Sequence, residues 1–448
     1  MLTLAEMAAQ FRADPNKEYR VLVGFEWELL LFERGTLKPL GYHGERGLGA
    51  ILEHVAQREG ATLAAGTPPN KLPLPDGGQI SVEPGGQFEF SSAPRPTYGG
   101  CMAQLRAFEE LVADVCDTFE VQAFYGGATP VHTVDAIGLV VPNERYSIMN
   151  EYFPRVGQMG RKMMRQTTSV QVTFDYRDRE IGTELFRTAL HLAPLAAAIF
   201  AHAPYIDNAD TGYRSYRGPI WAATDPARCG LLPGFEREDY SFLDYVAHVV
   251  EAPMFFVKTE KGVVDAGGMT FAQFNREGFR GRQATIDDFL LHNSTIFTDA
   301  RLKNTVELRS IDGQDPTMLP AVLAFLSGLL LCDTMRPRTL QRLEALELDF
   351  RRLAQELPRD GLSGEIAGLP ARELACELIE SARDGVATCF PDGEQGVAHL
   401  DPILELAQRG LTPADVVREE YGDPRAWLAS GRTFPAADGR DAGQRSNL

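Results

Sequence analysis

A chain of 448 residues, of which 44% are hydrophobic and 24% charged, is long enough to bury one large core or two smaller ones. Its formal net charge of −18 disfavours nucleic acid and anionic membrane surfaces as partners. The longest apolar stretches, 190–204 and 319–332, are shorter than the roughly 18 residues that span a bilayer, and the N-terminus shows no secretory signal pattern. We therefore expect a cytoplasmic protein without membrane or nucleic-acid partners.

The cysteines form no recognisable metal or redox motif. Six are present, at positions 101, 116, 229, 332, 376 and 389, and none belongs to a C-x-x-C pair. A free cysteine behaves as a small hydrophobic residue. We expect all six thiols to be reduced and mostly buried.

The first informative segment in chain order is 21–29, which alternates as a β-strand does. One face is apolar and consists of Val23, Phe25, Trp27 and Leu29. Glu26 and Glu28 share the other face, ~6.8 Å apart at a rise of ~3.4 Å per residue, close enough to bind one ion or two neighbouring ions. A single pair of this kind is more typical of a sheet with one solvated face than of a metal site.

A second alternating segment, 80–91, adds to this pattern. Gln87 and Glu89 face away from two phenylalanines. A tight Pro-Gly-Gly turn occupies 84–86, and Glu83 lies just before it, so both flanks of the turn present carboxylates.

Two further strands and several helices follow. Helical spacing predicts helices over 98–120 and about 183–203. The strand at 169–175 has a polar face with Ser169, Gln171, Thr173 and Asp175, and the strand at 304–310 has one with Thr305, Glu307 and Arg309.

The last hundred residues are helical in pattern. One helix is expected over 343–357, and another begins at Thr412, where a capping residue precedes Pro413 and Asp415. We expect a single domain over 1–435, strand-rich over 19–312 and helical over 313–430, with a disordered tail at 436–448.

If the four strands share one sheet, its polar face gathers carboxylates with few lysines to neutralise them. These carboxylates are Glu26, Glu28, Glu83, Glu89 and Glu307. Crowded like charges raise one another's pKa or require a cation, and oxygen donors without nearby His or Cys favour magnesium or manganese over zinc. Together with Arg309 on the same face, these carboxylates suit a site that binds nucleotide phosphates through a metal ion. A plain solvated sheet face is the alternative that the pattern leaves open.

Common catalytic motifs are missing from the sequence. There is no P-loop, no G-x-G-x-x-G and no signature of the serine hydrolases, zinc proteases or zinc deaminases. A nucleotide, if used, must therefore be bound in another way.

Several segments, taken together, resemble the plant and proteobacterial type of glutamate–cysteine ligase. The most specific are 24–28 (GFEWE), 81–89 (SVEPGGQFE) and 167–172 (TTSVQV). Other segments match in order and spacing. They are 145–149 (RYSIM), 215–221 (SYRGPIW) followed by Asp225, Arg228 and Gly230, 268–274 (GMTFAQF), and 301–309 (RLKNTVELR).

This resemblance implies an α+β fold in which a curved antiparallel sheet, shaped as a partial barrel, forms the active-site funnel, as in glutamine synthetase, with helices outside. It implies ATP-dependent joining of the γ-carboxyl group of glutamate to cysteine, with Mg²⁺ or Mn²⁺ as cofactor and a monomer or weak homodimer as the assembly. The five glutamates above would bind metal. Substrate binding falls to Arg145, Tyr146, Arg217, Trp221 and Arg309, and nucleotide binding to Gln171, Arg228 and Lys303.

The sequence departs from the family pattern in two places. Cysteines are absent near Pro320 and over 274–296, where plant members place regulatory pairs, so we expect no disulfide switch. Arg165 and Gln166 replace the expected order before Thr167, which could alter the choice of amine. A same-fold ligase with another amine acceptor, a guanidino phosphotransferase and a degenerate binding protein remain alternatives.

Overall fold

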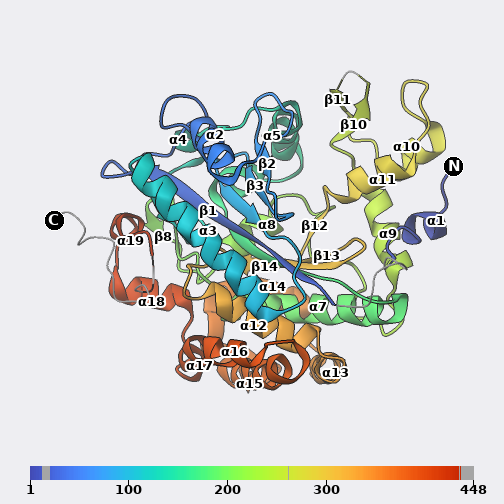
Figure 1. Cartoon of the computed structure of the whole chain (residues 1–448). Helices are drawn as coiled ribbons and strands as arrows, with labels where there is room; N and C mark the ends of the chain where they lie inside the picture. Colours follow the sequence, from blue (N-terminus) through green and yellow to red (C-terminus); the bar gives the residue numbers. More distant parts are fainter. Residues whose placement is uncertain (13–20, 261, 433, 435–448) are drawn as a thin grey trace.

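The computed structural model describes residues 1–12, 21–260, 262–432 and 434. Its centre is one large antiparallel sheet in the order β13-β14-β6-β1-β4-β3-β2, with β5 paired to a further part of β1 (Figure 1). All four strands expected from the alternation therefore lie in the same sheet, which confirms the premise of the polar face. The predicted tail at 436–448 lies outside the described residues.

The strands of this sheet are β1 (Val23–Glu33), β2 (Lys71–Pro73), β3 (Gln79–Val82), β4 (Phe88–Ser91), β5 (Val121–Phe124), β6 (Ser169–Phe174), β13 (Ala300–Leu302) and β14 (Val306–Asp312). The small pairs are β7 (Tyr205–Ile206) with β8 (Ala209–Asp210), β9 (Cys229–Gly230) with β12 (Phe297–Thr298), β10 (Phe256–Thr259) with β11 (Gly262–Asp265), and β15 (Glu365–Ile366) with β16 (Leu369–Pro370).

The helices before β14 are α1 (Leu4–Ala8), α2 (Leu48–Glu59), α3 (Tyr98–Thr118), α4 (Val134–Ile137), α5 (Glu144–Val156), α6 (Gly160–Gln166), α7 (Arg179–Ile199), α8 (Arg217–Ala222), α9 (Phe242–Glu251), α10 (Phe271–Glu277) and α11 (Ile286–Asn293). Those after it are α12 (Leu319–Leu330), α13 (Met335–Glu344), α14 (Phe350–Asp360), α15 (Ala371–Cys389), α16 (Glu394–Val397), α17 (Asp401–Gln408), α18 (Pro413–Glu420) and α19 (Pro424–Ser430), with short 3₁₀ turns at Gly361–Ser363 and Ala398–Leu400.

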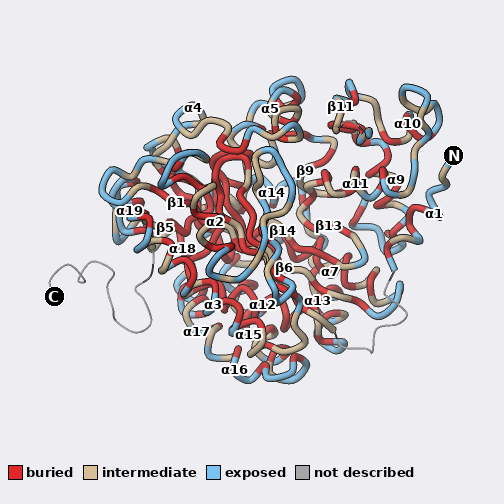
Figure 2. The backbone as a smooth tube through the Cα atoms, turned by 45° about the horizontal axis from the view of Figure 1, so that its top comes forward, coloured by how far each residue is buried: buried red, intermediate tan, exposed pale blue. Residues whose placement is uncertain are grey.

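The apolar face of the sheet forms the main core. Trp27 of β1 stacks on Tyr125 at 5.4 Å between ring centroids, and Phe108 of α3 meets the rings of Trp27 and Phe90 at 5.4 and 4.7 Å. Figure 2 shows the sheet strands and α12 as largely buried, with exposed segments at the periphery. Because this face is covered by helices, the alternating polar residues of the same strands must point to the opposite side.

The C-terminal helices differ from the prediction at one point. The single helix expected over 343–357 is two helices, α13 and α14, because the chain turns at Glu347, whose φ is 47°, and Asp349 caps the new helix through the N–H of Arg352. The helix expected at Thr412 is confirmed as α18, with the capping box formed by Thr412 and Asp415.

The expectation of six reduced thiols is wrong for one pair. Cys332, two residues after the end of α12, and Cys389, the last residue of α15, form a disulfide. The other four cysteines are free, namely Cys101, Cys116, Cys229 and Cys376. Sequence spacing could not find this pair, because 57 residues separate its members and only the packing of α15 on α12 brings them together.

Within the described part of the chain, no single helix is long and apolar enough to cross a membrane. The bent pair α12 and α13, with an angle of 87° between them, meets the criteria of length and composition only when the two are taken together.

We predict that the disulfide stabilises the fold without affecting activity. Closing a loop of this length removes entropy from the unfolded chain, so Cys332→Ser should lower the free energy of unfolding by about 2–4 kcal/mol. Catalytic rate should be unchanged because α12 and α15 pack beneath the apolar face. Urea denaturation with and without dithiothreitol measures the effect, and Cys376→Ser, a free cysteine on α15, is the control. Equal stability of the oxidised and reduced protein would contradict this.

Candidate active site

The polar face of the sheet brings the predicted glutamates onto neighbouring strands. Glu28 of β1 lies directly opposite Glu89 of β4, and Glu26 lies opposite Gln171 of β6. Side chains directly opposite in an antiparallel pair have Cβ atoms roughly 4.5–5.5 Å apart. The register therefore places Glu26, Glu28 and Glu89 in one cluster.

Burial and mutual repulsion alter the acidity of this cluster. Desolvation raises the pKa of Glu28 to about 7, with the charges of Glu83 and Glu26 adding to the effect. Desolvation, followed by repulsion from other carboxylates, also raises the pKa of Glu26 and of Glu89. Such a cluster favours protons or a cation as counterions.

Serine hydroxyl groups orient two of these carboxylates. Glu28 accepts hydrogen bonds from the backbone N–H and the hydroxyl group of Ser169, at 2.5 and 2.8 Å to Oε2. Glu89 accepts from the hydroxyl groups of Ser81 and Ser91 at 2.9 and 3.1 Å. Each of these two carboxylates is held through one oxygen.

The Pro-Gly-Gly turn positions Glu83 at the same site. Gln87, expected on the polar face, is buried instead: its side chain accepts from the N–H of Gly85 and donates to the carbonyl groups of Met164 and Thr167. A Cβ at Gly85 would lie 2.4 Å from the backbone of Arg165, so only glycine permits this close approach.

Glu83 accepts a hydrogen bond from Tyr146, one of the residues predicted to bind substrate. The hydroxyl group of Tyr146, on α5, donates to Glu83 Oε2 at 2.9 Å. Tyr146 is buried, and desolvation together with the neighbouring Glu83 raises its pKa well above the usual value. Tyr146 is therefore a neutral hydrogen-bond donor at the edge of the cluster.

Glu307 differs from the other four glutamates. It is buried and forms ion pairs with Arg301 at 2.7 Å, Arg309 at 2.8 Å and Lys303 at 3.3 Å. Although desolvation opposes ionisation, these three cations hold the pKa of Glu307 below its usual range. In this structure Glu307 is the counterion of three basic side chains, and its role as a metal ligand stays a prediction.

Arg309 reaches across the face to the neighbouring strand. Its Nη1 donates to the side-chain oxygen of Gln171 as well as to Glu307, and the Gln171 amide in turn donates to Ser169 at 3.2 Å. Gln171 and Arg309 thus lie together, between the cationic group around Glu307 and the carboxylate cluster.

Of the remaining predicted substrate residues, Arg217 lies near Glu28 and Arg145 lies over the ring of Phe256 at 5.6 Å. Arg217 of α8 is buried, donates to the carbonyl groups of Ser310 and Arg309 at 3.0 Å each, and lies over the ring of Trp221 at 5.2 Å. The Nε atoms of Arg145 and Arg217 and the Nε1 of Trp221 are buried without a partner among the described residues. Unpaired buried donors of this kind suit an anionic ligand.

A cavity of about 200 Å³ opens at the other end of the polar face. Its lining residues are Leu22, Gly24, Phe25, Glu26, Ser91, Ser92, Pro94, Thr173, Asp175 and Thr305. Glu26 is the point where this cavity meets the carboxylate cluster.

The two other residues predicted to bind nucleotide occupy different surroundings. Lys303 is 37% exposed and lies beside Glu307 and Thr305, near the cavity. Arg228 has no exposed surface, and its five N–H groups are used by Asp225, Thr295, Tyr152 and the Pro253 carbonyl group. The structure thus leaves Arg228 no donor for a nucleotide, in contrast to the sequence-based expectation.

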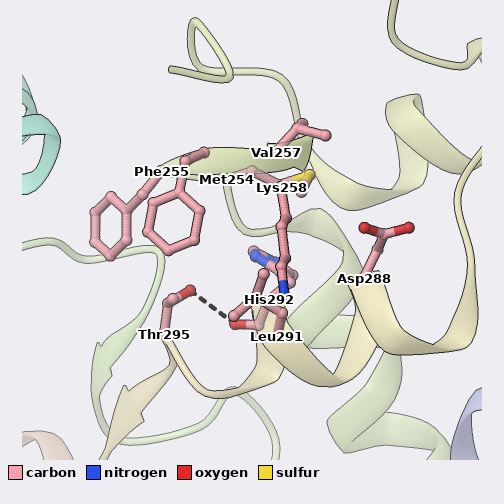
Figure 3. A pocket seen from close by; sticks show the side chains of 9 residues that line it. Met254, Phe255, Val257, Lys258, Asp288, Leu291, His292 and Thr295 are labelled. Carbon is pink, nitrogen blue, oxygen red and sulfur yellow. Dashed lines mark hydrogen bonds between the residues drawn. The ribbon is translucent and has the colours of Figure 1, made fainter. Parts of the chain in front are cut away.

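A second cavity, shown in Figure 3, lies beside Arg228 between β10 and α11. Its volume of about 10 Å³ holds roughly one water molecule. Two of its polar groups already have partners, because Asp288 pairs with Arg282 and the His292 ring bonds to the carbonyl group of Val249. This cavity offers no room for a substrate.

Sequence reasoning missed three charged residues at the site. Arg301 was quoted as part of a motif without a role, whereas Asp299 and Asp312 were not singled out. Arg301 neutralises Glu307, Asp312 accepts from the N–H of His202 and the hydroxyl group of Ser215, and Asp299 lies close to Arg217 and Arg309. Asp312 was detectable as a carboxylate ending the fourth strand, but Asp299 lies in a short connection with no pattern of its own.

Known proteins share this architecture. The fold resembles that of a crystallised glutamate–cysteine ligase from Francisella tularensis, solved in complex with AMP, with a TM-score of 0.51 over 94% of this chain and 91% of that one at 13% identity. The structure thus has the fold of a carboxylate–amine ligase, which confirms the predicted fold class.

The sequence comparisons narrow this class to one family. The chain belongs to glutamate–cysteine ligase family 2, whose family model matches residues 22–430. It is 31% identical over 426 residues to the chloroplastic glutamate–cysteine ligase of Nicotiana tabacum and 32% identical over 405 residues to that of Medicago truncatula. These alignments cover 94% and 89% of this chain and 80% and 78% of the relatives.

These findings confirm the predicted family and the prediction of a ligase enzyme. They contradict the expected cytoplasmic location, because the relatives are named as chloroplastic enzymes. That expectation rested only on the lack of a secretory signal pattern and of a long apolar stretch, and it is withdrawn.

The distinct surroundings of Glu307 and Glu83 lead to a stability prediction. Glu307→Gln would leave three buried or half-buried cations without their counterion and should lower the free energy of unfolding by about 3–5 kcal/mol. Glu83→Gln removes a charge from a self-repelling cluster and should leave stability unchanged or slightly raised. Chemical denaturation without metal or nucleotide compares the two variants. Equal stability of both would show that Glu307 is not a structural counterion.

Proposed function

We propose that this site joins the γ-carboxyl group of glutamate to the amino group of cysteine at the expense of ATP, with magnesium. The observation that carries the proposal is the order of groups along the polar face: the cavity at Gly24, then Glu26, then Glu28, then Arg217. A nucleotide in the cavity and an amino acid at Arg217 would meet across the carboxylate cluster.

The cavity suits a nucleotide because its polar lining is rich in hydrogen-bonding groups. Ser91 and Thr173 on the strands and Thr305 before β14 offer hydroxyl groups, and Lys303 lies next to Thr305. ATP bound there would direct its phosphates toward Glu26. Gln171 lies opposite Glu26 and is bonded to Arg309, so both would contact the terminal phosphate, and a planar guanidinium group can bind two phosphate oxygens at once.

The donor set of the cluster fits Mg²⁺, with Mn²⁺ as a second choice. Glu26, Glu28, Glu83 and Glu89 offer only hard oxygen ligands, and burial, with repulsion from other carboxylates, raises the pKa of Glu26, Glu28 and Glu89, so a nearby cation would stabilise their charged forms. Among the described residues, no three acidic, His or Cys side chains form a ready-made ion site. Magnesium is usually bound through one or two carboxylates plus substrate phosphates, which this cluster can supply.

Glutamate would bind at the opposite end. Arg217 uses one N–H of each terminal nitrogen for backbone carbonyl groups, so three of its N–H groups remain for a carboxylate. Trp221 and Arg145 add unpaired donors, and Tyr146 lies between this pocket and Glu83. A substrate held by its α-carboxylate here would extend its γ-carboxylate toward the cluster.

The chemistry then needs no protein nucleophile. An oxygen of the γ-carboxylate attacks the terminal phosphorus of ATP and displaces ADP, which gives an acyl phosphate. The amine of cysteine attacks the acyl carbon, loses a proton and displaces phosphate, which leaves the amide. Magnesium would offset charge between the two anions, while Arg309 and Arg217 orient them.

We predict that ADP release requires glutamate, an amine and Mg²⁺ together. ADP is measured with glutamate fixed while the amine is varied over the amino acids. Cysteine should give the highest turnover, and chelation of the metal should abolish it. Preference for a different amine would indicate the alternative acceptor, and comparable turnover without metal would contradict the mechanism.

Arg217→Lys and Glu83→Gln should impair different steps. Lysine keeps the charge but loses the planar fork, so glutamate binding should weaken by roughly 1.5–3 kcal/mol while nucleotide binding stays near normal. Glu83→Gln should lower kcat and raise the Mg²⁺ concentration needed for half-maximal rate. Steady-state kinetics over glutamate and Mg²⁺ separates them. Parental values for both variants would mean that these residues lie outside the active site.

A further inference from the structure

One carboxylate beside the proposed glutamate pocket is unengaged. Asp299 lies between β12 and β13, and its charge interacts with those of Arg217 and Arg309. No hydrogen bond or ion pair within 4 Å joins its side chain to another of the described residues. It is half-buried, so water does not fully compensate its charge.

The backbone fixes Asp299 in this place. Its N–H donates to the carbonyl group of Gly230 at 3.1 Å, and its carbonyl group accepts from the N–H of Arg309 at 2.8 Å. Phe297 of β12, two residues earlier, packs on Trp221 with 5.8 Å between ring centroids. The strand end that carries Asp299 is therefore attached to both α8 and β14, the elements that supply Arg217 and Arg309.

Three carboxylates influence Arg217, and two of them already have partners. Asp312 accepts from the N–H of His202 at 2.7 Å and the hydroxyl group of Ser215 at 2.9 Å. Glu28 accepts twice from Ser169 and belongs to the carboxylate cluster. Of these three carboxylate groups, only that of Asp299 accepts no hydrogen bond from another described residue.

A half-buried carboxylate group without a hydrogen-bond donor is costly. Desolvation raises the pKa of Asp299 to about 6, in spite of the two nearby arginines. Burying a charge without a hydrogen-bonding partner costs free energy, which a cationic ligand can recover. Asp299 therefore provides a place in the pocket, next to Arg217, for a positively charged group of a ligand.

We propose that Asp299 binds the α-ammonium group of glutamate, a step that rests on the function proposed above. The ammonium and carboxylate groups of an α-amino acid are attached to the same carbon, so their protein partners must lie side by side. Arg217 and Asp299 form such a pair, of opposite charge and anchored by neighbouring backbone segments. Asp299 thus determines that the pocket accepts an α-amino acid rather than a plain dicarboxylate.

Glutarate, which is glutamate without its amino group, tests this assignment directly. Binding of glutamate and of glutarate is measured by calorimetry in the presence of Mg²⁺ and a non-hydrolysable ATP analogue. The parent protein should prefer glutamate by about 10- to 100-fold, the effect of one hydrogen bond to a charged group. Asp299→Asn should weaken glutamate binding by that factor and leave glutarate binding unchanged, so the preference disappears.

Controls separate this idea from a general defect and from failure of the proposed function. Asp299→Glu should restore part of the preference, and Asp287→Asn, on the exposed first turn of α11, should retain all of it. Unchanged affinity of Asp299→Asn for the nucleotide analogue verifies folding. If the parent ligates glutamate to cysteine but Asp299→Asn keeps its preference, loses both ligands equally, or instead raises the KM for cysteine, the assignment is wrong while the function stands. A parent that does not distinguish the two ligands also overturns it.

Discussion

The burial of several carboxylates on one sheet face, together with their repulsion, is the constraint on which the rest of this structure depends. Glu26, Glu28 and Glu89 are fixed on paired strands, so they cannot move apart to relieve it. The apolar face of the same strands is locked by Trp27 and the phenylalanines of β4 against α3. The free energy of the core thus maintains a local charge arrangement that is unfavourable until a cation is supplied.

The negative charges on the polar face of the sheet are neutralised unevenly by neighbouring basic side chains. Around Glu307, Arg301, Lys303 and Arg309 supply more positive charge than that one carboxylate needs, whereas the cluster around Glu28 and Glu89 has serine hydroxyl groups in place of cations. A boundary between a cationic and an anionic region lies at Gln171, which bonds to both Arg309 and Ser169. A phosphate and its metal ion carry charges that match these two regions.

Sequence reasoning succeeded where a residue's position in the sheet follows from local alternation. The strands bearing Glu26, Glu28 and Glu89 and the shared sheet were predictable, because a period of two fixes which side chains share a face. Burial of Gln87, engagement of Arg228 and neutralisation of Glu307 were not, because each depends on partners far along the chain. The disulfide between Cys332 and Cys389 and the half-buried Asp299 arise in the same way from packing between elements that no sequence period relates.

The strand order has a consequence for the synthesis of the protein. The carboxylates of β1 and β4 belong to the first hundred residues, whereas Arg301 and Arg309 are carried by β13 and β14, far toward the C-terminus. During translation the acidic strands leave the ribosome well before the cations that lie beside them in the finished sheet. An incomplete chain therefore exposes these strand edges and their carboxylates without the basic partners, and pairings of such large sequence separation form slowly. The polar face of the sheet can therefore be completed only late in translation, after β13 and β14 have been synthesised.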